Sequence, residues 1–354
     1  MGISDSEYVE KLMANLISKN KINSAVIRVE SGDGRFSWTS ATGDMNTGSR
    51  YFLSSVTKFY LTAVVIQMIE EDLIRLEDKA ADYLPHEYAQ GLHVYKGVDY
   101  SSLITIKNLL SNTSGLADYF FHRKNNGKSK AKKLLESNDE LWNLDKTFHL
   151  IRKMNPKFPP GKKGKASYSD TNFQLLGKII EIVKEKRIDK VFQEYIFDPL
   201  KLKDTYVYSD SDDQTPVPFY YKSEKLWLPE YMTSVPAEGG IISTAEECML
   251  FLKAFFQGYF FPIETVSGLK KWNLILPPQG FFLFGIGLEK MWTPWILSPF
   301  KPISDIMGFR GQTGSFAWYN PDTDLYFCGT TNQIDSTGHA AAEKVLLKMI
   351  KKAW

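Results

Sequence analysis

Residues 51–71 read YFLSSVTKFYLTAVVIQMIEE, and this stretch constrains the fold more strongly than any other. Its apolar residues recur at helical spacing, which predicts a helix from Ser55 to Glu71. The longest apolar run, Phe59 to Ile69, is too short to cross a bilayer and follows a lysine. We therefore expect a helix buried in the interior of a globular protein.

Strands are predicted on both sides of this helix. Residues 24–43, SAVIRVESGDGRFSWTSATG, are two β-branched or aromatic runs around Gly32-Asp33-Gly34, which is a hairpin pattern. Beyond Pro278 the runs FFLFGIGLEKMW, SFAWYNP and LYFCGTTN are separated by Gly, Pro and Asp and are also typical of strands. Two further helices are predicted over 172–184 and 338–352.

Strands at both chain ends with helices between them predict an α+β protein. Its antiparallel sheet is formed by both chain ends and carries a mainly helical insertion. We expect residues 1–80 with 278–354 to form an α/β sandwich lobe and residues 81–277 to form a mainly helical lobe. The cleft between the two lobes is the expected place for an active site.

Charge and composition exclude several function classes. The 354 residues include 43 Lys and Arg against 41 Asp and Glu, a net charge of +2, so no excess of positive charge is available for nucleic acid phosphates. Apolar residues at 43% and charged residues at 24% are typical of soluble globular proteins and exclude a disordered or fibrous chain. Aromatic residues make up 14%, which fits either a rigid core or an apolar substrate cleft.

The two cysteines and the N-terminal residues indicate where in the cell the protein is expected. Cys248 and Cys328 are too few for a disulfide framework and match no zinc motif, so they are interpreted as packing residues, with a single disulfide left open. Residues 1–20 have the periodicity of a surface helix and lack a signal-peptide pattern. We expect no transmembrane segment and a cytoplasmic location, or an extracytoplasmic one if a leader has been removed. The oligomeric state is left open.

Motifs for metal, nucleotide and histidine-based chemistry are missing from the sequence. It contains no G-x-S-x-G, H-E-x-x-H, G-x-x-x-x-G-K-[ST] or strand-following G-x-G-x-x-G pattern. The five histidines lie far apart with no ligand spacing: His86, His93, His122, His149 and His339. We therefore expect neither a metal nor a cofactor.

One reactive pair remains, at the start of the predicted central helix. In Ser55-Val56-Thr57-Lys58 the serine and lysine are three residues apart, so they share a helix face and the ammonium can reach the hydroxyl. A lysine desolvated among apolar side chains can activate a serine as a nucleophile. An N-cap serine followed by a surface lysine is the alternative interpretation of this tetrapeptide alone.

Five segments in a definite order distinguish these alternatives. The segments are YFLSSVTKFYLTAVVIQMIEEDLIRLEDKAADYLP (51–85), ITIKNLLSNTSGLADY (104–119), FPPGKKGKASYSDTNFQLLGKIIE (158–181), GGIISTAEE (239–247) and GFRGQTGSFAWYNP (308–321). Together they resemble the serine β-lactamase and penicillin-binding protein superfamily, and most closely its class C β-lactamase and esterase branch. The resemblance implies a β-lactamase/transpeptidase-like fold and serine-based acyl transfer.

This resemblance also implies roles for individual residues. Ser55 is the implied nucleophile, Lys58 its activating lysine, and Tyr168 the tyrosine that shares proton transfer with the lysine. Because a tyrosine has a pKa near 10, we expect Lys58 to favour its ionised form, so that the two act as a coupled pair. Residues 312–314, Gln-Thr-Gly, match the third motif, in which glycine lets substrate approach the strand. The amides of Ser55 and Ser315 are the implied oxyanion hole.

Two departures from the family pattern concern the substrate. Asp170 replaces an asparagine that can donate to a substrate carbonyl, and a carboxylate there would instead attract a substrate amine. Gln312 replaces a lysine or histidine and so removes a cation that helps to bind a substrate carboxylate. With Thr313 and Gly314, these two residues form the predicted substrate-binding set.

The predicted function is that of a serine hydrolase acting through an acyl-enzyme on Ser55, with a small acyl compound as its partner. Carboxylic esters are the favoured substrates, followed by D-amino-acyl esters or amides, including D-alanine carboxypeptidase substrates, and then β-lactams. A penicillin-binding protein with poor turnover and a silent scaffold are the alternatives. Aromatic residues between Phe251 and Phe300 are expected to pack the core or to line an acyl pocket.

Overall fold

A computed structural model describes residues 3–20, 22–121, 128–136, 138–275, 282–293, 303, 305–334 and 336–353. Its main feature is an eight-stranded sheet in the order β10-β11-β12-β13-β14-β15-β1-β2, in which every neighbouring pair is antiparallel. The strands of this sheet are β1 Ala25–Ser31, β2 Ser37–Thr42, β10 Asn273–Leu274, β11 Phe282–Phe284, β12 Glu289–Met291, β13 Ile306–Arg310, β14 Ser315–Asn320 and β15 Leu325–Thr330.

Both ends of the chain build this sheet, as predicted. β1 and β2 form the expected hairpin, with Val29 opposite Trp38, and β1 also pairs with β15 along its length, with Val29 opposite Phe327. Alternate side chains of a strand point to opposite faces, so both faces of this sheet need a cover. Because β15 lies between β14 and β1, the N-terminal hairpin is joined directly to the C-terminal meander.

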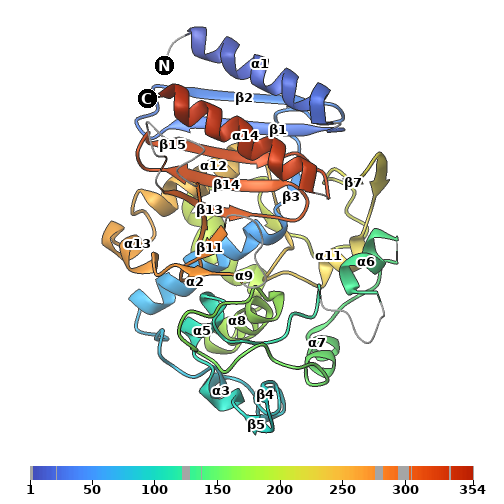
Figure 1. Cartoon of the computed structure of the whole chain (residues 1–354), viewed down its shortest axis with the longest axis vertical. Helices are drawn as coiled ribbons and strands as arrows, with labels where there is room; N and C mark the ends of the chain where they lie inside the picture. The colour runs from blue at the N-terminus through green and yellow to red at the C-terminus, as the bar shows by residue number, and fades with distance from the viewer. Residues whose placement is uncertain are drawn as a thin grey trace.

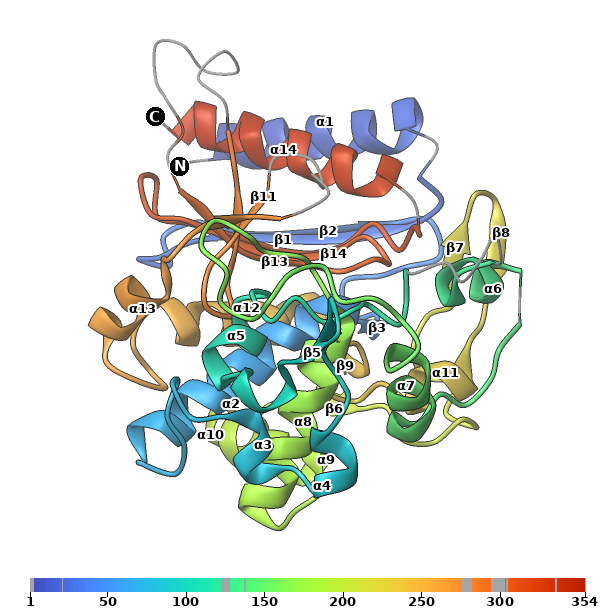
Figure 2. The ribbon, with the colours of Figure 1, turned by 60° about the horizontal axis from the view of Figure 1, so that its bottom comes forward.

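Helices cover both faces. α1 Ile3–Asn20 and α14 Ser336–Ala353 lie side by side on one face, and their apolar residues form a cluster with β1, β14 and β15. Figure 2 shows these two helices on one side of the sheet and the rest of the helices on the other. On that other side α12 Ala245–Phe256 packs against β15, β14 and β1. The predicted N-terminal surface helix, α1, therefore covers one face of the sheet together with α14.

The predicted central helix is present and is buried almost all round. α2 Thr57–Glu70 has every residue from Thr57 to Ile66 buried, because it lies between the sheet and the remaining helices (Figure 1). α8 Asp170–Lys184 packs against α2 and α5 and ends at Glu185, which has a left-handed backbone. The helices predicted at 172–184 and 338–352 are thus confirmed, each beginning two residues earlier than expected.

The part of the chain between the two ends of the sheet contains many short elements. Its helices are α3 Ala80–Tyr83, α4 His86–Ala89, α5 Ile106–Leu110, α6 Lys130–Leu135, α7 Leu144–Ile151, α9 Ile188–Phe192, α10 Asp198–Leu200, α11 Pro229–Thr233 and α13 Ile263–Leu269, with 3-10 turns at Ser54–Val56 and Ser101–Leu103 and a π turn at Gln193–Phe197. Its strands are β3 Tyr51–Phe52, β4 Val94–Tyr95, β5 Val98–Asp99, β6 Tyr206–Val207, β7 Phe219–Tyr221, β8 Glu224–Leu226 and β9 Ile241–Ser243.

The α+β class is confirmed, while residues 81–277 are less purely helical than expected. β3, β9 and β6 form a three-stranded sheet, and β4-β5 and β7-β8 form two small hairpins. α12 packs on the main sheet and β10 is one of its strands, although both lie within the range expected for the helical lobe. The division into two lobes stays a prediction.

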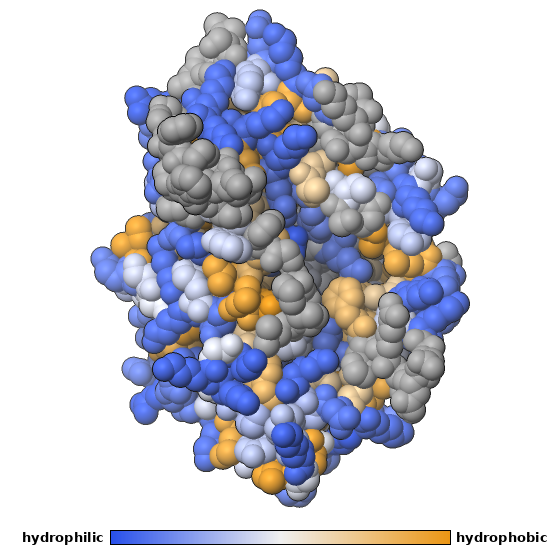
Figure 3. All heavy atoms as spheres, viewed as in Figure 1, coloured by the Kyte–Doolittle hydropathy of each residue, from blue (hydrophilic) through white to orange (hydrophobic). Residues whose placement is uncertain are grey.

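Figure 3 shows one face of the molecule, in the view of Figure 1. Hydrophilic residues predominate on this face, and apolar residues form small, separated groups, which agrees with the apolar and charged content of the sequence. None of the helices in the described part of the chain is both long enough and apolar enough for a membrane span.

Candidate active site

Ser55 lies where β3 passes into α2. α2 begins at Thr57, not at Ser55 as predicted, because a 3-10 turn at Ser54–Val56 precedes it. The backbone of Ser54 is left-handed, with φ 46°, a conformation that is uncommon for a residue other than glycine. This sharp turn places Ser55 at the exposed edge of an otherwise buried segment, half-buried itself and accessible to a substrate.

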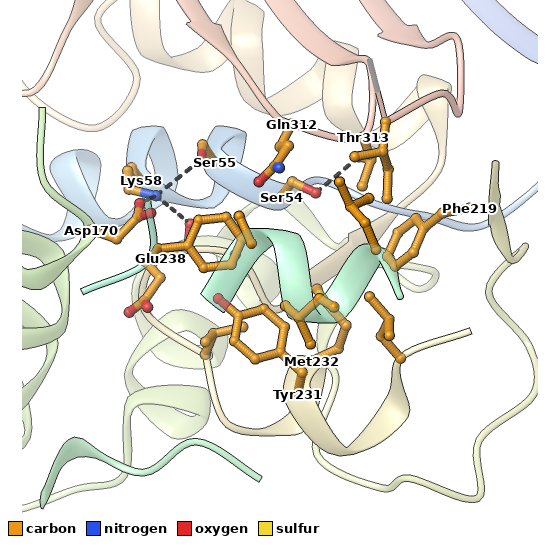
Figure 4. Close-up of a pocket in the computed structure, with 18 residues that line it drawn as sticks. Ser54, Ser55, Lys58, Asp170, Phe219, Tyr231, Met232, Glu238, Gln312 and Thr313 are labelled. Carbon is orange, nitrogen blue, oxygen red and sulfur yellow. Dashed lines mark hydrogen bonds and ion pairs between the residues drawn. The ribbon is translucent and has the colours of Figure 1, made fainter. Parts of the chain in front are cut away.

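Lys58 is almost completely buried, with 1% of its surface exposed, and its ammonium group has three close oxygen neighbours. Nζ donates to Ser55 Oγ over 3.1 Å and to the backbone oxygen of Glu238 over 2.8 Å, and it forms an ion pair with Asp170 Oδ1 at 2.7 Å (Figure 4). The predicted contact between the serine and the lysine is therefore present. The contact with Asp170 lacks hydrogen-bond geometry, because Asp170 Oδ1 is buried with no hydrogen-bond partner among the described residues.

Tyr168 approaches Ser55 from the segment that leads into α8. Its hydroxyl donates to Ser55 Oγ over 3.0 Å, so the serine, lysine and tyrosine predicted from three separate motifs meet at one oxygen. Burial and the neighbouring charge of Asp170 raise the pKa of Tyr168 well above its usual value. The expectation that Lys58 would favour the ionised phenol is therefore wrong, since Asp170 opposes that effect and Tyr168 is a neutral phenol at rest.

Asp170 has a partner that sequence reasoning did not assign to it. Its side chain is 9% exposed and forms an ion pair with Lys58, instead of facing only the substrate space. Asp170 also borders both cavities of the site, described below. One carboxylate therefore serves as counter-ion to the lysine and as part of the cavity wall.

The turn between β13 and β14 is attached directly to the nucleophile loop. Ser315 Oγ donates to Leu53 O over 2.6 Å, and Thr313 Oγ1 lies 2.9 Å from Ser54 Oγ. A Cβ on Gly311 would come within 2.5 Å of Leu53 O, so only glycine fits there. These contacts bring Ser315 next to the Ser55 loop, where the predicted oxyanion hole requires it.

Gly314 has a structural reason to be glycine besides the predicted approach of substrate. Its φ is +80°, and an added Cβ would lie 2.2 Å from Thr331 Oγ1. Gln312, by contrast, borders both cavities and faces the space in front of Ser55 (Figure 4). Of the predicted substrate-binding set, Asp170, Gln312 and Thr313 line the cavities.

Two cavities meet at Ser55. The first has about 580 Å³ of space between atoms, and apart from Ser54, Ser55, Lys58, Asp170, Glu238, Gln312 and Thr313 its lining is apolar or glycine. Its wall includes Phe120, Leu134, Phe219, Leu228, Tyr231 and Met232. The second has about 1400 Å³ and includes Tyr168, Phe282, Glu289, Arg310, His339 and Glu343. An apolar space thus lies on one side of the nucleophile and a more polar one on the other.

The aromatic segment beginning at Phe251 belongs mainly to the core. Phe251, Phe255 and Phe256 surround the ring of Phe59, with centroids 4.2 to 5.8 Å apart. None of the described residues from 251 to 293 lines the apolar cavity, whereas Phe282, Met291 and Trp292 are among those that line the larger one. The segment therefore contributes both to the core and to a cavity wall at Ser55, and residues 276–281 and 294–300 lie outside the described part of the chain.

Three further carboxyl groups surround the site and were not singled out from the sequence. Burial and Asp170 raise the pKa of Asp118 to about 7, and burial raises that of Glu289 to about 7. Glu238 is 4% exposed, and burial and Asp170 raise its pKa well above the usual value. Glu238 directly precedes the segment 239–247, which is one of the five segments that carry the family resemblance. This position is the feature of the sequence that could have indicated Glu238 as a site residue.

The histidines and cysteines lie away from the serine, with one exception. His93 is buried and bonds Phe158 O over 2.9 Å, whereas His339 borders the larger cavity. His122 lies outside the described residues. Both cysteines are free and buried, as expected of packing residues. Within the described ranges, no group of three or more His, Cys, Asp or Glu side chains is arranged to hold a metal ion.

Comparison with known proteins identifies the family. A family model described as Beta-lactamase matches residues 8–348. The chain is 30% identical over 163 residues to a putative D-alanyl-D-alanine carboxypeptidase of Escherichia coli (strain K12), covering 45% of this chain and 34% of that protein. It is 30% identical over 169 residues to a teichoic acid D-alanine hydrolase of Staphylococcus aureus, covering 48% of this chain and 35% of that protein. The matched region thus spans about a third of the length of these curated relatives.

A solved structure agrees over the whole chain. EstCE1, a hydrolase with promiscuous acyltransferase activity, superposes with a TM-score of 0.79 at 20% identity, covering 99% of each chain. This likeness confirms the predicted β-lactamase/transpeptidase-like fold. Since the family model covers nearly all of the sequence, the chain belongs to the beta-lactamase family, within the superfamily of β-lactamase and penicillin-binding protein hydrolases.

Proposed function

We propose that the protein is a serine hydrolase that forms an acyl-enzyme on Ser55. The observation that carries this proposal is the meeting of Lys58 Nζ and Tyr168 Oη at Ser55 Oγ, at 3.1 and 3.0 Å. A serine hydroxyl becomes a nucleophile when a neighbouring group accepts its proton, and both neighbours are within hydrogen-bond reach. Attack on a carbonyl carbon then forms the ester, and water releases the acyl group.

The ion pair suggests how the proton leaves Ser55. An ammonium group has no lone pair, so a charged Lys58 must lose one proton before it can accept the serine proton. Asp170 Oδ1, its ion-pair partner at 2.7 Å, can take that proton. The neutral amine left on Lys58 takes the proton of Ser55 as its oxygen bonds the carbonyl carbon. Tyr168, a neutral phenol, is placed to donate to the leaving group.

The oxyanion would be bound by the backbone amides of Ser55 and Ser315. The hydrogen bond from Ser315 Oγ to Leu53 O supports this role, because it fixes the start of β14 against the nucleophile loop. A donor held in advance of the reaction loses no orientational freedom when charge develops on the carbonyl oxygen. Each such donor typically lowers the barrier by about 3–4 kcal/mol.

Carboxylic esters with an apolar acyl group are the substrates that the cavities favour. The apolar cavity beside Ser55 fits an uncharged acyl chain or ring, and the larger cavity has room for the leaving group. Two cations that the structure describes at the cavity walls are already paired, Lys58 with Asp170 and Arg310 with Glu289 and Glu343. β-Lactams and D-alanine carboxypeptidase substrates, which carry a carboxylate, are therefore disfavoured.

D-amino-acyl esters or amides are the second candidate. Asp170 borders both cavities, and its carboxylate can accept hydrogen bonds from a substrate ammonium group, which favours a substrate with a free amine. The names of two relatives, a D-alanine hydrolase and a D-alanyl carboxypeptidase, point to the same acyl group.

Hydrolysis assays test the proposal. We expect wild-type protein to hydrolyse p-nitrophenyl acetate and butyrate faster than D-alanyl p-nitroanilide or nitrocefin, and Ser55→Ala to lose this activity. A fluorophosphonate should add one adduct to wild type and to Ser37→Ala, an exposed serine on β2, but none to Ser55→Ala by intact mass. Equal, slow hydrolysis by wild type and Ser55→Ala would refute the enzyme hypothesis. Labelling without turnover would instead identify a binding protein that is acylated and not released.

A further inference from the structure

Glu238 lies beneath the catalytic lysine with its side chain turned away from the nucleophile. Its backbone oxygen accepts from Lys58 Nζ over 2.8 Å, while Figure 4 shows its carboxyl group pointing away from Ser55. The residue is 4% exposed and follows α11 in the chain. The same residue therefore holds the lysine through its main chain and brings a carboxyl group into the protein interior.

Tyr119 holds one oxygen of this carboxyl group and is itself bonded to Tyr231. The hydroxyl of Tyr119 donates to Glu238 Oε1, and the hydroxyl of Tyr231 lies 3.1 Å from that of Tyr119. Tyr119 is fully buried, and its ring stacks on that of Trp142 with centroids 5.7 Å apart. These contacts leave Glu238 little freedom to turn.

The other oxygen of the Glu238 carboxyl group, Oε2, has no hydrogen-bond partner among the described residues. Among the described residues, Glu238 Oε2 and Gln174 Oε1 are both buried without a hydrogen-bond partner, and the Gln174 side chain lies beside the carboxyl group. A buried polar atom without a hydrogen-bond partner destabilises the folded protein. Both atoms are acceptors, so a single proton on Oε2, donated to Gln174 Oε1, would satisfy the two together.

The charges around Glu238 agree with a retained proton. Burial is the main cause of its raised pKa and the charge of Asp170 raises it further, whereas the charge of Lys58 and the hydrogen bonds with Tyr119 and Gln174 act in the opposite direction. The titratable groups that face it are Lys58 on α2, Asp170 at the start of α8, Tyr119 and Tyr231, and Lys178 and Glu181 border a cavity that it shares on the far side of α8.

We infer that Glu238 is a positioning residue that works as a neutral acid, bonded to Tyr119 and Gln174, so that its backbone oxygen stays aligned on Lys58. The positioning role rests on the proposed function of Ser55 and Lys58, whereas the neutral state does not. An ionised Glu238 would place a second carboxylate beside the pair of Lys58 and Asp170 and would oppose the build-up of negative charge on Ser55 and the substrate. The neutral acid leaves Asp170 as the carboxylate partner of the lysine.

Glu238→Gln and Glu238→Ala separate this role from simple packing. Glutamine keeps the shape and the lack of charge, so we expect kcat/KM for p-nitrophenyl butyrate to stay within about 3-fold of wild type. Alanine removes the bonds to Tyr119 and Gln174, so we expect kcat to fall by about 10- to 100-fold with little change in KM. A loss in Glu238→Gln as large as that in Glu238→Ala would overturn the inference, because it would mean that a carboxylate is needed.

Two pH-dependent measurements provide independent readouts. Wild-type kcat/KM should fall as pH rises through the pKa of Glu238, and the Glu238→Gln profile should lack this step. Infrared spectra at about pH 8.5, above the values of about 7 for Asp118 and Glu289, should show a protonated-carboxyl band in wild type that Glu238→Gln lacks. No difference between these two spectra would show Glu238 to be ionised and would sink the inference.

The infrared result does not depend on catalysis. If Ser55 is neither acylated nor labelled, the proposed function fails while the spectra still decide the state of Glu238. Thermal unfolding shows whether each variant is folded. If Glu238→Ala does not fold, the pH profile and the infrared spectra of Glu238→Gln still test the inference.

Discussion

Lys58 Nζ lies 2.7 Å from Asp170 Oδ1, and both side chains are buried, with 1% and 9% of their surfaces exposed. The ion pair puts a carboxylate at the position where the family pattern has a neutral amide. Removing one partner of a buried pair leaves an uncompensated charge, which usually costs about 3–5 kcal/mol. The reactivity of Ser55 is therefore linked to Asp170 as well as to Lys58.

We predict that Lys58→Ala and Tyr168→Phe each slow acylation of Ser55 by at least about 100-fold, because each removes a proton-transfer group from the serine oxygen. The rate of fluorophosphonate labelling measures this step. Lys186→Ala and Tyr259→Phe, which change exposed residues of the same types, should label at the wild-type rate. Normal labelling of either site variant would remove that residue from the proposed mechanism.

Asp170→Asn tests recognition of a substrate amine. D-alanine methyl ester and methyl propionate differ only in the amine, so loss of the carboxylate should lower kcat/KM for the first by about 10-fold or more relative to the second. Steady-state kinetics of both esters measure the ratio. An equal fall for both esters would show that Asp170 acts through Lys58, its ion-pair partner, and not through the substrate.

Asp170→Asn combined with Gln312→Lys restores the two residue types of the family pattern. The new amide can donate to a β-lactam carbonyl, and the new cation, which borders both cavities, can bind the β-lactam carboxylate. We expect nitrocefin to acylate the double variant at least about 10-fold faster than wild type. Unchanged nitrocefin kinetics would count against this account of specificity.

Gly311→Ala should damage both stability and activity. The added Cβ would meet Ser315 Oγ at 2.2 Å and Leu53 O at 2.5 Å, so the turn after β13 would have to move away from the nucleophile loop. We expect a loss of about 1–3 kcal/mol in the free energy of unfolding and slower labelling of Ser55. Gly268→Ala is the matched control, because its Cβ meets no atom within 4 Å, and alanine in helix α13 should be neutral or stabilising. Equal stabilities of the two variants would contradict the close contact.

Glu289 predicts a pH-dependent stability. Its pKa is raised to about 7 in the folded protein from a usual value of 4.5, so the folded state holds a proton that the unfolded state has lost. Stability should therefore fall as pH rises from about 4.5 to about 7 and then level off. Glu289→Gln cannot titrate, so its unfolding free energy relative to wild type should rise by about 1–3 kcal/mol between pH 5 and pH 8. Denaturant unfolding across this range checks the trend, and a constant difference would contradict it.

Local patterns predicted the elements that depend on neighbouring residues in the chain. The apolar spacing of α2 and the turn residues between β1 and β2 reflect helical and strand geometry, which a short window contains. The pairing of Ser55 with Lys58 is local too, because one helical turn brings them together. Tyr168 and Ser315 were reached through the resemblance to a family, since nothing near them in the chain indicates that they meet Ser55.

Other features escaped prediction because they depend on packing. The sequence does not distinguish core packing from a pocket wall for the aromatic residues between Phe251 and Phe300, since an aromatic run has the same composition in both. Phe251, Phe255 and Phe256 pack in the core. α12 joins the sheet cover although its range was assigned to the helical lobe. Apolar residues show that a segment is buried, but not which partner buries it.

By itself, the sequence determined the α+β class, the central helix with its Ser55 and Lys58 pair, and the order of motifs that identifies the family. Only the tertiary structure decided the electrostatic surroundings of the serine, through Asp170 on Lys58 and the buried Glu238 beneath it. The reason is physical. A charge is set by burial and by partners within a few ångströms, and here those partners lie 112 and 180 residues from Lys58 in the chain.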